Sequence, residues 1–135
     1  MEYNLFCDDY RNPKDCIGYV YQFGIRPDIY INREWVIVRD YNQFVNYITE
    51  HGLPILVSFD HDLGEKAYEH GAQSNWTEFD YDSCDEKTGM DCAKWLVDYC
   101  IDNKVKLPEC LVHSMNTCGR ANIQSYLDNY KKVSG

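Results

Sequence analysis

The amino-acid sequence predicts an α/β domain in which a mostly parallel central sheet lies between two layers of helices. Short apolar runs of strand length alternate with segments of helical periodicity. Strands joined by helical crossovers run parallel, and the crossovers are right-handed. The chain has 135 residues, which is the usual size of one domain. We therefore expect a single three-layer domain over residues 1–135.

The first predicted strand covers residues 4–7, a short apolar run that stops at Asp8 and Asp9. The next residues, 10–13, have the composition of a turn. Residues 14–34 mix tyrosine, isoleucine, glycine and proline without a stable period. A loop, a ribbon and an irregular helix therefore all remain open for that segment.

Two further strands are predicted on either side of a helix. Residues 35–39 form a β-branched run, and Asp40 follows as a candidate N-cap for a helix that ends near Gly52. Residues 54–59 form the most apolar strand of the chain. It breaks into charge at residues 60–62, which are Asp, His and Asp.

A polar, aromatic and acidic segment at residues 65–88 predicts a long surface loop or lid. Thr88 and Asp91 then have the spacing of a capping box. The helix that they open should bury an apolar face made of Ala93, Leu96, Val97, Cys100 and Ile101.

The last predicted strand is the short apolar run at residues 110–112, which ends in the polar residues 113–116. A final helix is expected from Thr117 onward. Three predicted strands thus end in polar clusters, at residues 8–9, 60–62 and 113–116. Ligands of parallel sheets bind outside the carboxyl ends of the strands, so these clusters predict one polar site at that edge.

Two histidines in these clusters, His61 and His113, are the expected acid and base of the site. Imidazole titrates near neutral pH, and two rings facing each other across a phosphate can divide the two roles. The alternative is structural: His61 hydrogen-bonds the neighbouring backbone and His113 caps a strand end.

Four aspartates at the same edge, Asp8, Asp9, Asp60 and Asp62, would repel one another. Magnesium is the expected relief, since its shell prefers oxygen ligands and a substrate phosphate. Alternatively, one aspartate of a pair points away and caps a helix or turn.

Positive charge for a phosphate can come from Arg11, Arg39 or Arg120, and Arg120 falls in the first turn of the final helix. For Arg11 and Arg39, an ion pair with the aspartates is the alternative. In the long loop, Trp76 and Tyr81 can stack on a base or cover the core, whereas His70 has no patterned partner.

The net charge of −9 argues against binding to long double-stranded nucleic acid, because every phosphate contact needs a cation. No apolar run is long enough for a membrane span, and the N-terminus lacks a signal-peptide pattern. The seven cysteines are odd in number and form no C-x-x-C pair. We therefore expect a cytoplasmic protein with reduced thiols; its oligomeric state stays open.

Four blocks of the sequence resemble the cyclic-phosphate processing receiver-like domain family of bacteria and their phages. The blocks occur in the family's order and span nearly the whole chain: residues 5–13 (LFCDDYRNP), 58–64 (SFDHDLG), 88–91 (TGMD), and 113–116 (HSMN) with 119–123 (GRANI). The chain departs from the family pattern at Thr117, where the family usually has proline, and in its longer stretch between Gly64 and Thr88.

The resemblance implies a receiver-like, flavodoxin-like fold and phosphoesterase-like processing of a cyclic phosphate, such as the 2′,3′-cyclic end of RNA or a nucleotide. The chain ends one helix after Asn116, so the fold should be truncated relative to a full receiver, and the lysine that follows a receiver's fifth strand has no counterpart. A phosphorylated-nucleotide binding or sequestering module and a degenerate receiver that acts through protein contacts are the alternatives.

The predicted site residues fall into three groups. The catalytic group is His61, His113, Asp60 and Ser114; the phosphate-binding group is Arg11, Asn116, Arg120 and Asn122; the magnesium ligands are Asp8, Asp9 and Asp62.

Overall fold

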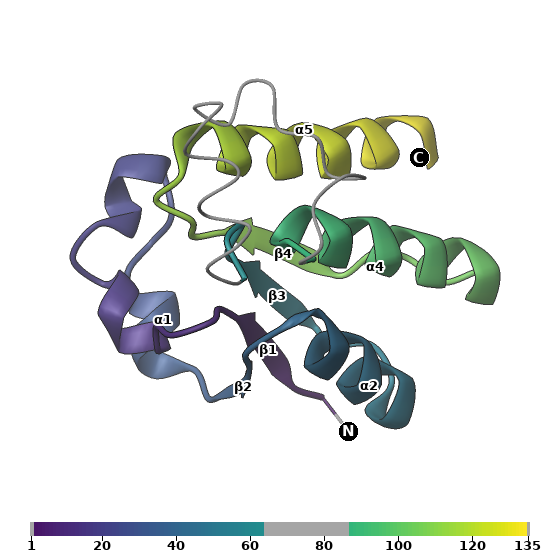
Figure 1. Ribbon diagram of the computed structural model, residues 1–135, viewed down its shortest axis with the longest axis horizontal. Coiled ribbons are helices and arrows are strands. Elements are labelled where there is room, and N and C mark those ends of the chain that lie inside the picture. The colour runs from purple at the N-terminus through teal and green to yellow at the C-terminus, as the bar shows by residue number, and fades with distance from the viewer. Residues whose placement is uncertain (1, 64–86, 135) are drawn as a thin grey trace.

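The computed structural model describes residues 2–63 and 87–134 (Figure 1). Within these residues four strands form one sheet and helices cover it. The elements in chain order are β1 (Asn4–Cys7), η1 (Pro13–Cys16), η2 (Val20–Phe23), α1 (Asp28–Asn32), β2 (Trp35–Val38), α2 (Tyr41–His51), β3 (Leu56–Phe59), α4 (Gly89–Asn103), β4 (Glu109–Val112) and α5 (Thr117–Ser134).

All neighbouring strands of the sheet run parallel, in the order β2-β1-β3-β4. This is the strand order of the flavodoxin-like arrangement, without a fifth strand in the described residues. The prediction of a receiver-like fold shorter than a full receiver is therefore confirmed.

The strands end level with one another at the carboxyl edge of the sheet. Cys7 pairs with Phe59, and Phe59 pairs with Val112. Backbone hydrogen bonds continue one residue further: the N–H of Asp60 donates to the carbonyl of Cys7, and the N–H of His113 donates to the carbonyl of Phe59, both at 2.9 Å. This register carries the polar clusters that follow the strands to the same edge.

The two faces of the sheet bury different layers because side chains alternate along each strand. Leu5 and Cys7 of β1 pack with the apolar faces of α2, α4 and α5. Phe6 points to the opposite face, where it packs with Cys16, Val20 and Tyr30 from the short helices. Figure 1 shows these short helices on one side of the sheet and α4 and α5 on the other. The segment 14–34, for which the sequence left three alternatives, is thus an irregular helical layer.

Helix ends follow the predicted signals. The Asp40 carboxylate accepts the N–H of Gln43 at 2.8 Å, and Gly52 ends α2 with φ of 85°. The N–H of Thr88 donates to the Asp91 carboxylate at 2.8 Å, which is half of the predicted capping box.

The prediction of a buried apolar face on α4 is wrong for one residue. Ile101 is 54% exposed, whereas Ala93, Leu96, Val97 and Cys100 are buried. Ile101 lies in the last turn of α4 and follows Cys100, the last buried residue of the helix. The six described cysteines are free thiols, and no described helix is long and apolar enough to cross a membrane.

Gly89 brings the start of α4 against the backbone that follows β3. A Cβ atom on Gly89 would overlap the carbonyl oxygen of Asp60, and the N–H of Gly89 donates to the carbonyl of His61 at 2.8 Å. The close approach explains the glycine of the Thr-Gly-Met-Asp block, because no other residue fits without moving a backbone segment.

We expect Gly89→Ala to lower the free energy of unfolding by about 3 kcal/mol, since rigid backbone must give way. Gly18→Ala is the matched control: Gly18 is exposed and a Cβ there meets nothing within 4 Å, so it should change stability by less than about 0.5 kcal/mol. Urea denaturation measures both variants. Equal stabilities of the two would contradict the packing argument.

Candidate functional site

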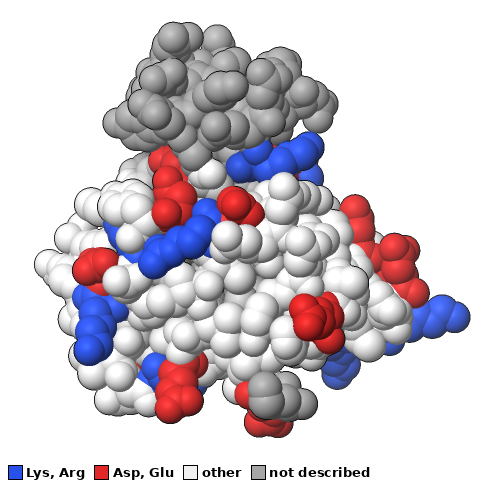
Figure 2. Space-filling view, turned by 60° about the horizontal axis from the view of Figure 1, so that its bottom comes forward, with Lys and Arg blue, Asp and Glu red and all other residues white. Residues whose placement is uncertain are grey.

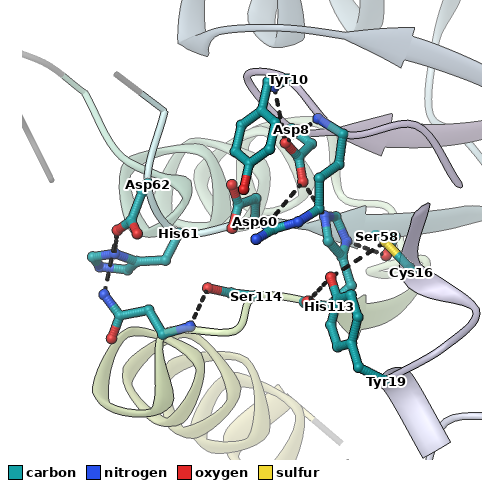
Figure 3. Close-up of polar contacts among 12 residues, drawn as sticks. Asp8, Tyr10, Cys16, Tyr19, Ser58, Asp60, His61, Asp62, His113 and Ser114 are labelled. Atoms are coloured by element: carbon teal, nitrogen blue, oxygen red, sulfur yellow. Dashed lines mark hydrogen bonds and ion pairs between the residues drawn. The ribbon is translucent and has the colours of Figure 1, made fainter. Parts of the chain in front are cut away.

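Asp8, Asp60 and His113 meet where β1, β3 and β4 end (Figure 3). Their side chains are almost wholly buried, with exposed fractions of 0%, 2% and 0%. Each can offer one ligand atom, and these three atoms lie within 4.8 Å of one another. The group can therefore bind a metal ion, as the sequence predicts for this edge.

Asp8 is surrounded by hydrogen-bond donors. Its Oδ1 accepts the backbone N–H groups of Tyr10 at 3.0 Å and Arg11 at 2.8 Å, and its Oδ2 accepts Nε2–H of His113 at 2.9 Å. Burial by itself raises the pKa of Asp8, but the bond from His113 and the two backbone bonds outweigh burial and lower the pKa. Asp8 is therefore an ionised carboxylate at neutral pH.

Asp60 has the opposite character. Burial, followed by the nearby charges of Asp8 and Asp62, raises the pKa of Asp60 to about 8, although the Arg11 guanidinium acts in the other direction. Asp60 is thus largely protonated at neutral pH. The edge of the sheet holds an ionised and a protonated carboxyl group side by side, which is the arrangement that separates base from acid.

The predicted magnesium ligands Asp9 and Asp62 fall outside the three-residue group. Burial and the charge of Asp8 raise the pKa of Asp9 to about 6, and its Oδ1 is buried without a hydrogen-bond partner. Asp62 is engaged elsewhere: its Oδ1 accepts Nδ1–H of His61 at 2.8 Å and a proton of the Asn116 amide at 3.3 Å. Of the predicted ligand set, the described residues bring only Asp8 into the group, joined by Asp60 and His113.

His61 is held between the segment after β3 and the start of α5. Its ring is fully buried, and a Cβ atom on Gly119 would overlap it. Glycine at position 119 therefore allows the first turn of α5 to lie against the imidazole. The carboxylate of Asp62 fixes the proton on Nδ1 and turns Nε2 into the basic atom of the ring.

Ser114 and Asn116 build the turn that carries this arrangement. Asn116 accepts the N–H of Gly119 at 2.9 Å, as a helix cap does, and its own N–H donates to Ser114 Oγ at 3.1 Å. The turn forms with Thr117 in the place of the family's usual proline. Ser114 is 1% exposed. Ser114 and Asn116 both lie at the site, where their side chains hydrogen-bond backbone groups of the same turn.

The two histidines do not face each other. Figure 3 shows His61 and His113 on opposite sides of Asp60 and Ser114. The His113 ring stacks on Phe6 at 4.4 Å between centroids and is fully buried. Burial lowers the pKa of His113, against the opposing influence of Asp8, so its ring is neutral.

Arg11 is the cation next to the carboxyl pair. Its guanidinium lies 3.6 Å from Asp8 and 3.9 Å from Asp60, and the side chain is 16% exposed. Arg39 instead donates to backbone carbonyls, those of Asp8 at 3.3 Å and Arg11 at 2.6 Å, and to the Asn12 side chain at 2.7 Å. Arg39 thus shapes the loop after β1, an outcome that neither sequence alternative included.

Arg120 lies apart from the carboxyl pair. Its guanidinium is 3.9 Å from the centre of the Phe23 ring, and the residue lines a hollow with residues of η2, β4 and α5 such as Leu111 and Gln124. Asn122 is half-buried on α5. Phosphate binding by these two residues stays a prediction. The predicted loop or lid, with His70, Trp76 and Tyr81, lies outside the described residues.

Sequence reasoning missed three residues that contact His113. Ser58 Oγ is 2.7 Å from its Nδ1, Tyr30 is 2.6 Å from Ser58, and the hydroxyl of Tyr19 donates to the His113 carbonyl at 2.8 Å. Ser58 carried the one available signal, because it is the only polar residue in an otherwise apolar strand. The tyrosines come from the irregular layer and carried none.

Comparison with known proteins gives one match. A family model described as "Cyclic-phosphate processing Receiver domain" matches residues 3–129. No curated protein and no solved structure matches this chain.

We expect the free energy of unfolding to fall as the pH rises from about 4 to about 8, with Asp60 as the main cause. The pKa of Asp60 is about 8 in the folded chain and near its ordinary 3.8 in the unfolded chain, so the folded state holds the extra proton in this window. Between pH 6 and pH 9, Asp60→Asn should reduce the fall in the free energy of unfolding by roughly 2 kcal/mol. This is less than an independent group would give, because Asp8 and Asp60 titrate together.

Urea denaturation at pH 6 and pH 9 measures this difference. Asp102→Asn, an exposed aspartate on α4, is the control and should behave like the wild type. An Asp60→Asn variant with the full wild-type fall would mean that another group holds the proton.

Proposed function

We propose, from the premise that this chain belongs to the cyclic-phosphate processing receiver domain family, that it opens a 2′,3′-cyclic phosphate of an RNA end or nucleotide at the carboxyl edge of its sheet. The observation that carries the proposal is the carboxyl pair of Asp8 and Asp60, held in different protonation states beside Arg11. Such a pair supplies a proton and accepts an anion without a net repulsion of two negative charges.

Opening a cyclic phosphodiester is an in-line displacement at phosphorus. It requires a base for the attacking water, an acid for the leaving oxygen and positive charge on the other phosphate oxygens. His61, with its Nδ1 proton fixed by Asp62, is our candidate for the base. Without a bound metal, Asp60 is our candidate for the acid, since it holds a proton at neutral pH. Bound magnesium would displace that proton, and the ion would then stabilise the leaving oxygen in its place.

Arg11 is the proposed phosphate anchor. Its guanidinium is 3.6 Å and 3.9 Å from the two carboxylates, distances of an ion pair that are longer than a hydrogen bond. Phosphate oxygens can therefore compete for its N–H groups, and the planar guanidinium suits bidentate contact. Additional contacts from Ser114, Asn116, Arg120 and Asn122 remain predictions.

Magnesium fits the oxygen donors of this edge. Asp8 and Asp60 would hold the ion, and Asp9, with its unpartnered buried oxygen, is the proposed third oxygen ligand. The bound ion would polarise a phosphoryl oxygen. His113 is less suited to magnesium, since imidazole is a softer ligand and both of its ring nitrogens already have hydrogen-bond partners.

The surface charge favours a small ligand or a short strand end. On the face in Figure 2, acidic and basic residues are interspersed among uncharged ones, and neither sign forms a continuous track. Together with the net charge of −9, this distribution supports the binding of one phosphate group over a long polyanion.

A degenerate receiver that accepts a phosphoryl group on Asp60 is less well supported. A carboxyl group with its pKa raised to about 8 is a poor nucleophile at neutral pH. The cation beside it is Arg11, from the loop after β1, whereas receivers use a lysine that follows a fifth strand. A module that binds a phosphorylated nucleotide without turnover is the stronger rival, because the same charges would serve it.

We expect His61→Ala to lower kcat for hydrolysis of 2′,3′-cyclic nucleotides or cyclic-phosphate-ended oligonucleotides by about 10²–10⁴-fold, the usual contribution of a general base. His51→Ala is the matched control, since His51 is an exposed histidine on α2, and its activity should equal that of the wild type. Steady-state kinetics on a panel of such substrates, with circular dichroism of each variant, makes the measurement.

Each outcome separates the candidates. Substrate binding without turnover by the wild type would favour the sequestering module. Labelling by a small phosphoryl donor that disappears in Asp60→Asn would favour the receiver. Full activity of a folded His61→Ala variant would remove His61 from the mechanism.

Magnesium should raise the melting temperature of the wild type and not that of Asp60→Asn, with Asp102→Asn behaving like the wild type. At a concentration 100-fold above Kd, the stabilisation should be about 2.7 kcal/mol. The effect should be larger at pH 9 than at pH 6, because the ion must displace the proton of Asp60.

Differential scanning calorimetry at constant ionic strength, with NaCl in place of MgCl2 as reference, measures these shifts. If magnesium changes neither the melting temperature nor the turnover of the wild type, the metal proposal is wrong and Arg11 is the cation of the site.

A further inference from the structure

We infer that Tyr30 and Ser58 are positioning residues of the site: they hold the His113 ring through its Nδ1, so that its Nε2–H keeps the Asp8 carboxylate in place. The inference rests on the proposed function for its catalytic consequence. The observation behind it is a continuous buried chain of hydrogen bonds: Tyr30 Oη to Ser58 Oγ at 2.6 Å, Ser58 Oγ to His113 Nδ1 at 2.7 Å, and His113 Nε2 to Asp8 Oδ2 at 2.9 Å.

The direction of every bond in this chain follows from its last member. Asp8 is an ionised carboxylate and can only accept, so His113 Nε2 must carry a proton. The His113 ring is fully buried and stacked on Phe6, surroundings that favour the neutral imidazole with one N–H, so its Nδ1 accepts. Ser58 must therefore donate to Nδ1.

The same reasoning orients the first bond. The hydroxyl proton of Ser58 is used on Nδ1, so the Ser58 oxygen accepts and Tyr30 donates. Protons thus point one way along the chain, from Tyr30 through Ser58 and His113 to Asp8. The opposite tautomer of His113 would place an unprotonated Nε2 against a carboxylate, with no proton between two acceptors.

The surroundings of Ser58 indicate that its hydroxyl is there for this bond. Ser58 is the only polar residue of the buried strand β3 and is 0% exposed, between Val57 and Phe59, which are both 0% exposed. Figure 3 shows its oxygen beside the His113 ring. A buried hydroxyl is stabilising only where it is hydrogen-bonded.

Tyr30 extends the control to the irregular layer. It lies on α1, is 2% exposed and packs edge-on against the His113 ring, with 6.3 Å between centroids. Its ring also stacks on Trp35 at the start of β2. The layer formed by residues 14–34 therefore supports the site through specific hydrogen bonds, from Tyr19 to the His113 carbonyl and from Tyr30 to Ser58, as well as through packing.

The test combines two variants with a matched control. Ser58→Ala removes the donor to Nδ1, and Tyr30→Phe removes the donor to Ser58 with almost no change in volume. Tyr3→Phe is the control, because the hydroxyl of the buried Tyr3 donates to the carbonyl of Gly52 at the other end of β1. It loses a bond of the same kind away from His113.

The first readout needs no turnover. The ¹⁵N chemical shifts of the His113 ring, assigned by their loss in His113→Gln, report which nitrogen carries the proton at one fixed pH. We expect the Nε2–H tautomer in all of these proteins, because Asp8 requires it. The Nδ1 shift should change clearly in Ser58→Ala, where Nδ1 loses its donor, and should not change in Tyr3→Phe. Tyr30→Phe should shift the same signals in the same direction by less, which keeps the test decisive if Ser58→Ala fails to fold.

The second readout is kinetic. Residues that orient a functional group through another side chain typically contribute 10–100-fold, so kcat for the cyclic phosphate should fall by that factor in Ser58→Ala while KM changes little. The Tyr3→Phe variant should keep wild-type kcat.

An unchanged Nδ1 shift in a folded Ser58→Ala or Tyr30→Phe variant would overturn the inference. The expected shift changes in the variants, together with no turnover by the wild type, would instead support the positioning chain and reject the proposed reaction. The two ideas can therefore fail separately.

Discussion

The structure depends on a buried carboxylate, that of Asp8, which the sheet register places beside a second one. An ionised carboxylate at 0% exposure is costly unless donors surround it, and three hydrogen bonds with Arg11 nearby meet this need. Burial raises the pKa of its neighbour Asp60, and the charge that Asp8 keeps raises it further. The protonation states of Asp8 and Asp60 therefore depend on each other.

Elements distant in sequence form the surroundings of these two carboxyl groups. α4 and α5 each begin with a close backbone or ring approach that only glycine permits, at Gly89 and Gly119. The irregular layer contributes Tyr19, which donates to the carbonyl of His113, and Tyr30, which is hydrogen-bonded to Ser58. Functional sites often carry such costs in stability.

The sequence predicted most of the frame because its signals are local. The apolar runs, the cap at Asp40 and the capping box at Thr88 depend on neighbours within a few residues, and parallel order follows from the alternation of strands and helices. Ile101 was wrong because burial at a helix end depends on what packs there. The segment 14–34 stayed open because its short helices follow the shape of the sheet face that they cover and have no period of their own.

The sequence by itself determined the fold class and the edge of the sheet where polar residues gather, because a change from apolar to charged residues marks the end of each strand. Only the tertiary structure decided which of those residues meet: Asp8 with Asp60 and His113, and His61 with Asp62 and Asn116. It also decided their protonation. A pKa depends on burial and on charges within a few ångströms, and these are set by contacts between strands, which spacing along the chain does not encode.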